Sequence, residues 1–85
     1  MNQAIQFPDR ESWDDELKAV CFPVLINGFQ QTCRISAGQL AQRYGGDAPE
    51  QCLSLFRQHR WDLEEIFEKM VLNDEYDSQG YFSLS

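Results

Sequence analysis

Two apolar-rich runs flank the Asn27-Gly28 pair and predict a β-hairpin within AVCFPVLINGFQQTCRIS, residues 19–36. Asn-Gly is the dipeptide that most readily adopts the positive φ angles of a two-residue type I′ turn. This turn fixes the strand pairing, from Ile26 opposite Phe29 to Val20 opposite Ile35. One face of the hairpin then collects the residues that we expect in the core: Val20, Phe22, Val24, Ile26, Phe29, Cys33 and Ile35.

Pro23 lies inside the first strand of this hairpin and limits what can pair with it. At the predicted register it stands opposite Thr32 at a non-hydrogen-bonded position, so the hairpin does not need its missing N–H. Pairing on the outer side of the strand cannot run through a proline. We therefore expect that this strand is an edge or that its outer neighbour stops short of Pro23.

Two short strands are predicted near the ends of the chain. NQAIQF alternates apolar Ile5 and Phe7 with polar residues and is closed by Pro8-Asp9, which indicates a strand within residues 3–7. GYFSLS follows a polar segment and indicates a strand at residues 80–84, which is stable only as part of a sheet.

Capping signals predict two helix starts after the hairpin. Ser36 and Gln39 have the spacing of a capping box, and the helix that they open is expected to end at Tyr44, before Gly45-Gly46. Asp47 and Glu50 predict a second helix, with a proline tolerated in its first turn.

A third helix start is predicted at WDLEEI. Asp62 and Glu65 form a capping box, and Trp61 and Ile66 occupy hydrophobic-staple positions. A continuous helix over residues 48–73 is the alternative. The helix after Asp62 presents one apolar stripe, formed by Leu63, Ile66, Phe67, Met70 and Val71.

These elements predict an α+β fold of two layers. An antiparallel sheet built on a central β-hairpin, residues 18–35, would pack against two to three C-terminal helices. A chain of 85 residues is too short to divide into two cores, so we expect residues 1–85 to form a single compact domain.

The net charge of −7 is concentrated in one part of the chain, since residues 62–77 carry seven acidic residues and one lysine. Such a surface repels phosphate backbones and anionic membranes and favours basic partners, although a solvated helix face explains it as well. Residues 1–6 lack a basic signal-peptide start, and no apolar run approaches a bilayer span. We expect a soluble cytoplasmic protein that binds no membrane.

Metal binding is the first chemistry to weigh, because Cys21, Cys33, Cys52 and His59 form a nominal ligand set. The hairpin register places Cys21 and Cys33 on opposite faces of the sheet, where they cannot hold one ion or form a disulfide. We therefore expect no metal and no cofactor, and an odd number of cysteines suits a reducing compartment.

Catalysis is not indicated by any residue pattern in the chain. Cys52 and His59 are two helical turns apart, roughly 10 Å along the axis, which is too far for a nucleophile and its base. The carboxylates of Glu64, Glu65 and Glu68 lie on the outer face of a helix, where no pocket is implied. We expect that the protein is not an enzyme.

RQHRW carries the one candidate interaction patch, formed by Arg57, His59, Arg60 and Trp61. Cationic and aromatic side chains at a turn between helices suit a carboxylate, a phosphate or an acidic side chain of a partner. Structural roles compete with this interpretation, because basic residues favour a helix C-terminus and Trp61 fits a hydrophobic staple.

Four stretches, MNQAIQFPDRESWD, CFPVLINGFQQTC, GGDAPEQ and FRQHRWDLEE, resemble the YrdB-like family of small bacterial proteins, a domain of unknown function. The resemblance covers nearly the whole chain. It implies a compact α+β domain and brings no catalytic residues to this sequence.

The leading functional hypothesis is a small non-enzymatic protein-interaction or regulatory module, a monomer or weak homodimer, whose protein partner is unidentified. A nucleic-acid-associated or transcription-related regulator is the first alternative, although acidity makes nucleic acid an unlikely partner. It would use a set of arginines, Arg34, Arg43, Arg57 and Arg60. A small-ligand-binding protein or enzyme with an unrecognised pocket is the second alternative.

Overall fold

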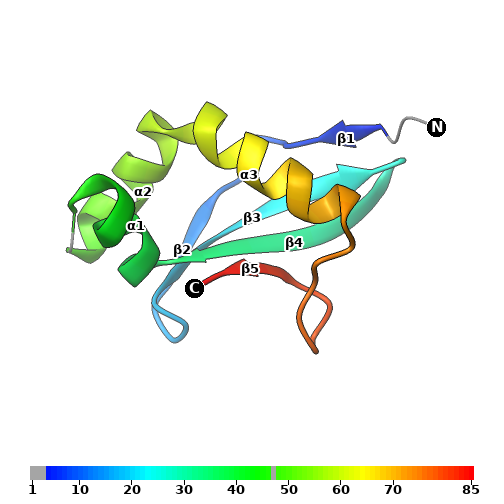
Figure 1. Ribbon diagram of the computed structural model, residues 1–85. Coiled ribbons are helices and arrows are strands. Elements are labelled where there is room, and N and C mark those ends of the chain that lie inside the picture. Colours follow the sequence, from blue (N-terminus) through cyan, green and yellow to red (C-terminus); the bar gives the residue numbers. More distant parts are fainter. Residues whose placement is uncertain (1–3, 47) are drawn as a thin grey trace.

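The computed structural model describes residues 4–46 and 48–85 and shows helices packed on one face of a β-sheet (Figure 1). The strands are β1 (Ile5–Gln6), β2 (Ser12–Asp14), β3 (Ala19–Ile26), β4 (Phe29–Ser36) and β5 (Phe82–Leu84). The helices in the described residues are α1 (Ala37–Tyr44), α2 (Pro49–Gln58) and α3 (Arg60–Leu72). The predicted α+β fold with a central hairpin is confirmed.

The hairpin of β3 and β4 has the predicted register. Ile26 pairs with Phe29, and the pairing continues in step to Ala19 opposite Ser36. Asn27 and Gly28 have φ angles of 53° and 84°, as a type I′ turn requires. The two strand cysteines consequently lie on opposite faces, and all three cysteines of the chain are free thiols.

The outer side of β3 pairs with two short strands rather than one. β1 pairs with Leu25 and Ile26, and β2 pairs with residues 19–21, so Pro23 falls in the gap between them. The expected interruption at Pro23 is confirmed. β2 itself was not predicted, because Ser12–Asp14 is too short for an alternating pattern.

The sheet is mixed, whereas the sequence predicted a wholly antiparallel sheet. β5 pairs in parallel with β4, from Cys33 opposite Phe82 to Ile35 opposite Leu84. The three helices connect these two strands, and α3 carries the chain back along the sheet to the end at which β4 begins (Figure 1). A connection of this kind brings the next strand in parallel to the first.

The first helix follows its predicted caps. The Gln39 N–H donates to the Ser36 hydroxyl oxygen at 3.1 Å, and Gly45 ends α1 with a φ of 84°. For the second helix, the predicted cap at Asp47 lies outside the described residues. Ala48 is the residue at the N-terminal boundary of α2, where its N–H donates to the Gln51 side chain at 3.3 Å.

The predicted break between the second and third helices is confirmed, and it lies at His59. The predicted start of the third helix was wrong, because α3 begins at Arg60, ahead of Asp62. Asp62 does not cap the helix. Its carboxylate accepts a hydrogen bond from the Tyr44 hydroxyl, and Trp61 is 88% exposed, so no hydrophobic staple forms.

The core lies between the sheet and the helices. The Phe22 ring from β3 packs against Phe56 and Phe67, with ring centroids 4.7 Å and 4.8 Å away. The buried cluster contains Val20, Phe22, Val24, Cys33, Ile35, Leu40, Cys52, Phe56, Leu63, Phe67, Val71 and Phe82.

The prediction that Phe29 belongs to this core was wrong, because its side chain is 75% exposed. Phe29 lies on the face of β4 that the helices cover, but at the turn end of the hairpin. At this end a cavity lies between α3 and the side chains of Ile26 and Gln31, so the helical layer does not pack directly on the turn end of the hairpin. The alternating pattern alone could not show where that layer stops.

Within the described part of the chain, none of the helices combines the length and the apolar character needed to cross a bilayer.

Candidate functional site

Arg60, a member of the predicted interaction patch, fastens the loop between β1 and β2 to α3. Its guanidinium donates to Glu11 at 2.7 Å, to Glu64 at 2.7 Å and to the carbonyl oxygens of Phe7 and Pro8 at 3.1 Å and 2.8 Å. The side chain is only 15% exposed. Because its N–H groups are directed at partners within the chain, Arg60 offers little to an external ligand.

Arg57 shares the Glu11 carboxylate with Arg60 but remains accessible. Its Nε donates to Glu11 at 2.7 Å, while its side chain is 60% exposed and that of Glu11 only 10%. The hydrogen bond from Arg57, with further contributions from Arg60, lowers the pKa of Glu11 below its usual value. Glu11 therefore holds both arginines in place as a carboxylate.

His59 is stacked on Tyr44, which joins α1 to the junction of α2 and α3. The two rings are nearly parallel, with centroids 3.8 Å apart. The Tyr44 hydroxyl donates to the Asp62 carboxylate at 2.6 Å. Burial, followed by this hydrogen bond, raises the pKa of Tyr44 to about 12.

Trp61 is the most exposed member of the predicted patch. Its side chain is 88% exposed and borders an open depression of about 380 Å³. The depression is lined by Arg57, Gln58, His59, Arg60, Trp61 and Asp62. The structure thus brings the four predicted residues together, and it leaves Arg57 and Trp61 as the members that a partner can reach.

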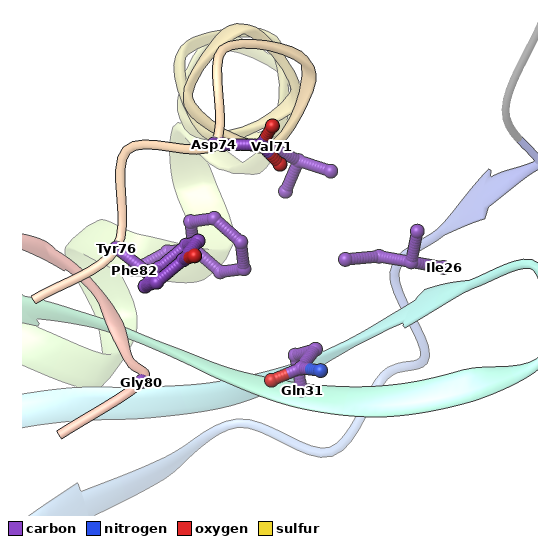
Figure 2. Close-up of a pocket in the computed structure, with 7 residues that line it drawn as sticks. All are labelled: Ile26, Gln31, Val71, Asp74, Tyr76, Gly80 and Phe82. Carbon is purple, nitrogen blue, oxygen red and sulfur yellow. The ribbon is translucent and has the colours of Figure 1, made fainter.

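A second cavity lies at the turn end of the hairpin, where sequence reasoning placed no site. It has a volume of about 290 Å³, and Figure 2 shows side chains from β3, β4, α3 and the loop after α3 around it. Its apolar walls come from Ile26, Val71 and Phe82, and Gln31 extends toward it from β4. The lining residues in the described part of the chain are Ile26, Gln31, Val71, Asp74, Tyr76, Gly80 and Phe82.

Charge and aromatic surface border this cavity. Among the residues that the structure describes, Asp74 is the one charged residue in the lining, and the exposed Glu75 follows it in the chain. Tyr76, which is 59% exposed, packs edge-on against Phe82 with ring centroids 6.0 Å apart. Phe29 shares the face of β4 that carries Gln31. The one feature of the sequence that could have indicated this site is the aromatic Tyr76 within the acidic segment NDEYD.

Asp77 holds the loop that forms one wall of the cavity. One carboxylate oxygen accepts the N–H groups of Gln79 and Tyr81 at 2.9 Å and 3.0 Å, and the other accepts from Ser83 and Arg34 at 2.8 Å and 2.9 Å. These contacts, chiefly the Tyr81 N–H, lower the pKa of Asp77 to about 2. The loop that forms this wall of the cavity is therefore held in place by hydrogen bonds to Asp77.

The arginines considered for nucleic-acid binding are occupied in similar ways. Arg34 pairs with Asp77, and both Arg57 and Arg60 pair with Glu11, while the Arg43 Nε donates to Gln39 at 3.2 Å. Carboxylates compensate the positive charges of Arg34, Arg57 and Arg60, which weakens the attraction of this surface for phosphate, whereas the Gln39 amide leaves the charge of Arg43 in place.

The thiols are poor nucleophiles in this structure. Burial raises the pKa of Cys33 to about 12, and it also raises the pKa values of Cys21 and Cys52 above the usual range. A thiol is a nucleophile or a metal ligand in its thiolate form, which these environments disfavour. Within residues 4–46 and 48–85, no three His, Cys, Asp or Glu residues are grouped as a metal site.

Comparison with known proteins gives consistent matches along the chain. The model of a family described as a protein of unknown function, DUF1488, matches residues 5–84. The chain is 60% identical to the uncharacterized protein YrdB of Escherichia coli (strain K12) and 59% identical to that of Shigella flexneri, over 95% of both chains in each case.

The fold also matches a solved structure. The crystal structure of a DUF1488-family protein of unknown function from Shewanella loihica PV-4 superimposes with a TM-score of 0.90 and 35% identity, covering 99% of this chain and 94% of that one. The resemblance to a YrdB-like family is confirmed. The chain therefore belongs to the DUF1488 family of proteins of unknown function.

Proposed function

We propose that this chain is a non-enzymatic protein-interaction module and that a partner binds at the cavity beside the hairpin turn. The observation that carries the proposal is an open cavity with apolar walls, which is lined by the exposed ring of Tyr76 at 59% exposure. Phe29, at 75% exposure, pairs on β4 with Ile26, which lines the cavity. Aromatic residues are enriched at protein interfaces, because they bury a large area and lose little conformational freedom.

The composition of the cavity supports a macromolecular partner. Ile26, Val71 and Phe82 give an apolar centre, while Gln31 and Asp74 add polar groups at its border. An apolar centre with a polar rim is the common arrangement of a protein interface. Binding at this position would also cover Phe29, whose exposure is otherwise unfavourable.

The state of the reactive groups supports a non-catalytic role. The raised pKa values of the three thiols disfavour nucleophilic chemistry, and the carboxylates of Glu11 and Asp77 are occupied in holding loops. The proposal places the module in the cytoplasm, where free cysteines persist as thiols.

The predicted patch of Arg57, His59, Arg60 and Trp61 is a second proposed contact surface. Trp61 would be its anchor, since a tryptophan buried on binding is among the strongest contributors to interface affinity. Arg57, at 60% exposure, could pair with an acidic group of the partner.

Site-specific photo-crosslinking in the native host tests the proposal. The crosslinking amino acid benzoylphenylalanine would replace Gln31 beside the cavity, Gln58 beside Trp61, or Gln42 on α1 as a control; all three glutamines are exposed. We expect a nuclease-resistant protein product from position 31 that is absent from position 42, and a stoichiometric complex when the pair is purified and mixed.

The outcomes separate the alternatives. A product from position 58 alone would transfer the binding surface to the Trp61 patch. Nuclease-sensitive products would favour a nucleic-acid role. Products that are the same from all three positions, or no product at any of them, would contradict the proposed interaction module.

A further inference from the structure

We infer that the partner contributes an extended basic segment, which pairs with the free edge of β4 and inserts a lysine or arginine side chain into the cavity. This inference rests on the proposed function and specifies its partner. Four features carry it: an unpaired strand edge, the absence of edge protection, the direction of the side chains and the charge of the cavity.

The edge of β4 near the hairpin turn is unpaired in the described part of the chain. β5 pairs with β4 only over Cys33–Ile35, and residues 29–31 are exposed. In a two-residue hairpin, Gln30 occupies a non-hydrogen-bonded position opposite Leu25. Its N–H and C=O groups consequently point away from β3 and toward this edge.

This edge also lacks the devices with which proteins protect free strand edges. The sequence from Phe29 to Thr32 is FQQT, which contains no proline and no charge. The opposite edge of the hairpin is protected in two ways. Pro23 interrupts it, and β1 and β2 pair with the strand on either side of this proline. An exposed edge without protection suits the addition of a strand from a partner.

The cavity lies where a side chain of an added strand would point. Side chains alternate along a strand, and Gln31 on β4 points toward the cavity (Figure 2). Residues directly opposite each other on neighbouring strands project to the same face. The residue of an added strand opposite Gln31 would therefore direct its side chain toward Ile26, Val71 and Phe82.

The chemistry of the cavity selects a long cationic side chain. Apolar walls suit the methylene stem of lysine or arginine, and the Asp74 carboxylate can accept a hydrogen bond from the charged end. Among residues 4–46 and 48–85, no basic residue lines the cavity. Residues 62–77 carry seven acidic residues against one lysine. The acidic surroundings attract a basic segment and repel an acidic one.

Charge argues against a second copy of this chain as the occupant. The edge of β4 could in principle pair with itself across a two-fold axis. Each copy carries a net charge of −7, and the pairing would bring two acidic loops that contain Asp74 and Glu75 to one interface. Like charges at an interface disfavour association.

Selection from a display library of random twelve-residue peptides tests the inference with the purified chain. We expect selected peptides enriched in lysine or arginine at one position. Binding should weaken about tenfold in Asp74→Asn, because one charge-assisted hydrogen bond is lost. Asparagine tolerates the left-handed conformation of residue 74, where φ is 53°. Glu68→Gln, which changes the net charge equally on the exposed face of α3, should bind as the wild type does.

The strand pairing has its own variant and control. Gln30→Pro removes an N–H that the hairpin does not use, and it should abolish binding, whereas Gln30→Ala should retain it. Slower amide exchange of Gln30 in the peptide complex of the wild-type chain tests the same pairing without a substitution. Selected peptides without a basic residue, equal effects of Asp74→Asn and Glu68→Gln, or unchanged exchange at Gln30 would overturn the inference.

The two proposals fail in different ways. A partner that crosslinks at position 31 and binds Asp74→Asn and Gln30→Pro as well as the wild type would overturn the extended basic segment and leave the interaction module intact. If sedimentation shows that the chain is a dimer at the selection concentration, and no peptide binds at β4, a second copy of the chain would replace the basic segment as the occupant of this edge.

Discussion

The guanidinium of Arg60 and the carboxylate of Glu11 lie 2.7 Å apart, although 49 positions separate the two residues in the sequence. Both side chains are largely buried, at 15% and 10% exposure. The contact joins the loop between β1 and β2 to the first turn of α3. Arg60, which was predicted as part of a surface patch, is therefore part of a tertiary contact that helps to define the fold.

Replacing Arg60 by alanine should destabilise the protein strongly. The change leaves the Glu11 carboxylate buried with fewer partners, and it removes one donor from the carbonyl oxygens of Phe7 and Pro8. We expect a loss of about 3 kcal/mol in the free energy of unfolding, measured by denaturant titration, as for other broken buried ion pairs.

Arg57→Ala is the matched control, because it removes the other arginine on the same carboxylate. The Arg57 side chain is 60% exposed, so its ion pair is screened by water. We expect a loss below about 1 kcal/mol. Equal losses in the two variants would show that Arg60 has no special structural role.

We expect Asp77 to make the free energy of unfolding depend on pH in the acid range. Its pKa in the folded chain is lowered from 3.8 to about 2, chiefly by the Tyr81 N–H. A carboxyl with a lowered folded pKa stabilises the protein fully above the unfolded pKa, and this stabilisation is lost as the pH falls through the folded value. We therefore expect Asp77→Asn to reduce the loss of stability between pH 3.8 and about 2. A carboxyl titration by NMR with a midpoint at or above 3.8 would refute this assignment.

The stacked rings of Tyr44 and His59 should be energetically coupled. Their centroids lie 3.8 Å apart, and they join α1 to the start of α3. A double-mutant cycle with Tyr44→Ala and His59→Ala should give a coupling energy of about 1 kcal/mol. Additive effects of the two substitutions would mean that the stacking contributes nothing beyond the area that each ring buries.

The thiols should react in the order of their exposure. Cys21 is partly exposed, while Cys33 and Cys52 are buried, and all three pKa values are raised. With iodoacetamide at mildly alkaline pH, mass spectrometry of peptides should detect slow alkylation of Cys21 first. Alkylation of Cys33 or Cys52 in the folded chain ahead of Cys21 would contradict the burial described above.

Local signals predicted much of the fold. The hairpin register follows from Asn27 and Gly28, and the start of α1 follows from Ser36 and Gln39, because the interacting groups are only a few positions apart. Interactions of this length can be read from spacing alone. The same is true of the break near His59, although its capping residue was misassigned.

Long-range contacts explain what the sequence did not reveal. The exposure of Phe29 depends on where the helical layer stops, and Arg60 acts through Glu11, far away in the sequence. The cavity combines Ile26 with residues near the end of α3 and in the loop before β5. No periodic pattern connects these segments, so only the assembled fold could identify the cavity as a candidate site.

Hydrogen–deuterium exchange of the chain, alone and with the partner captured at position 31, tests the central claim most directly. The account predicts slower exchange in the complex over residues 29–32 and 71–82, which border the cavity and the free edge of β4, with α1 unchanged. Slower exchange confined to α1 and α2, or no change anywhere in a stoichiometric complex, would contradict it.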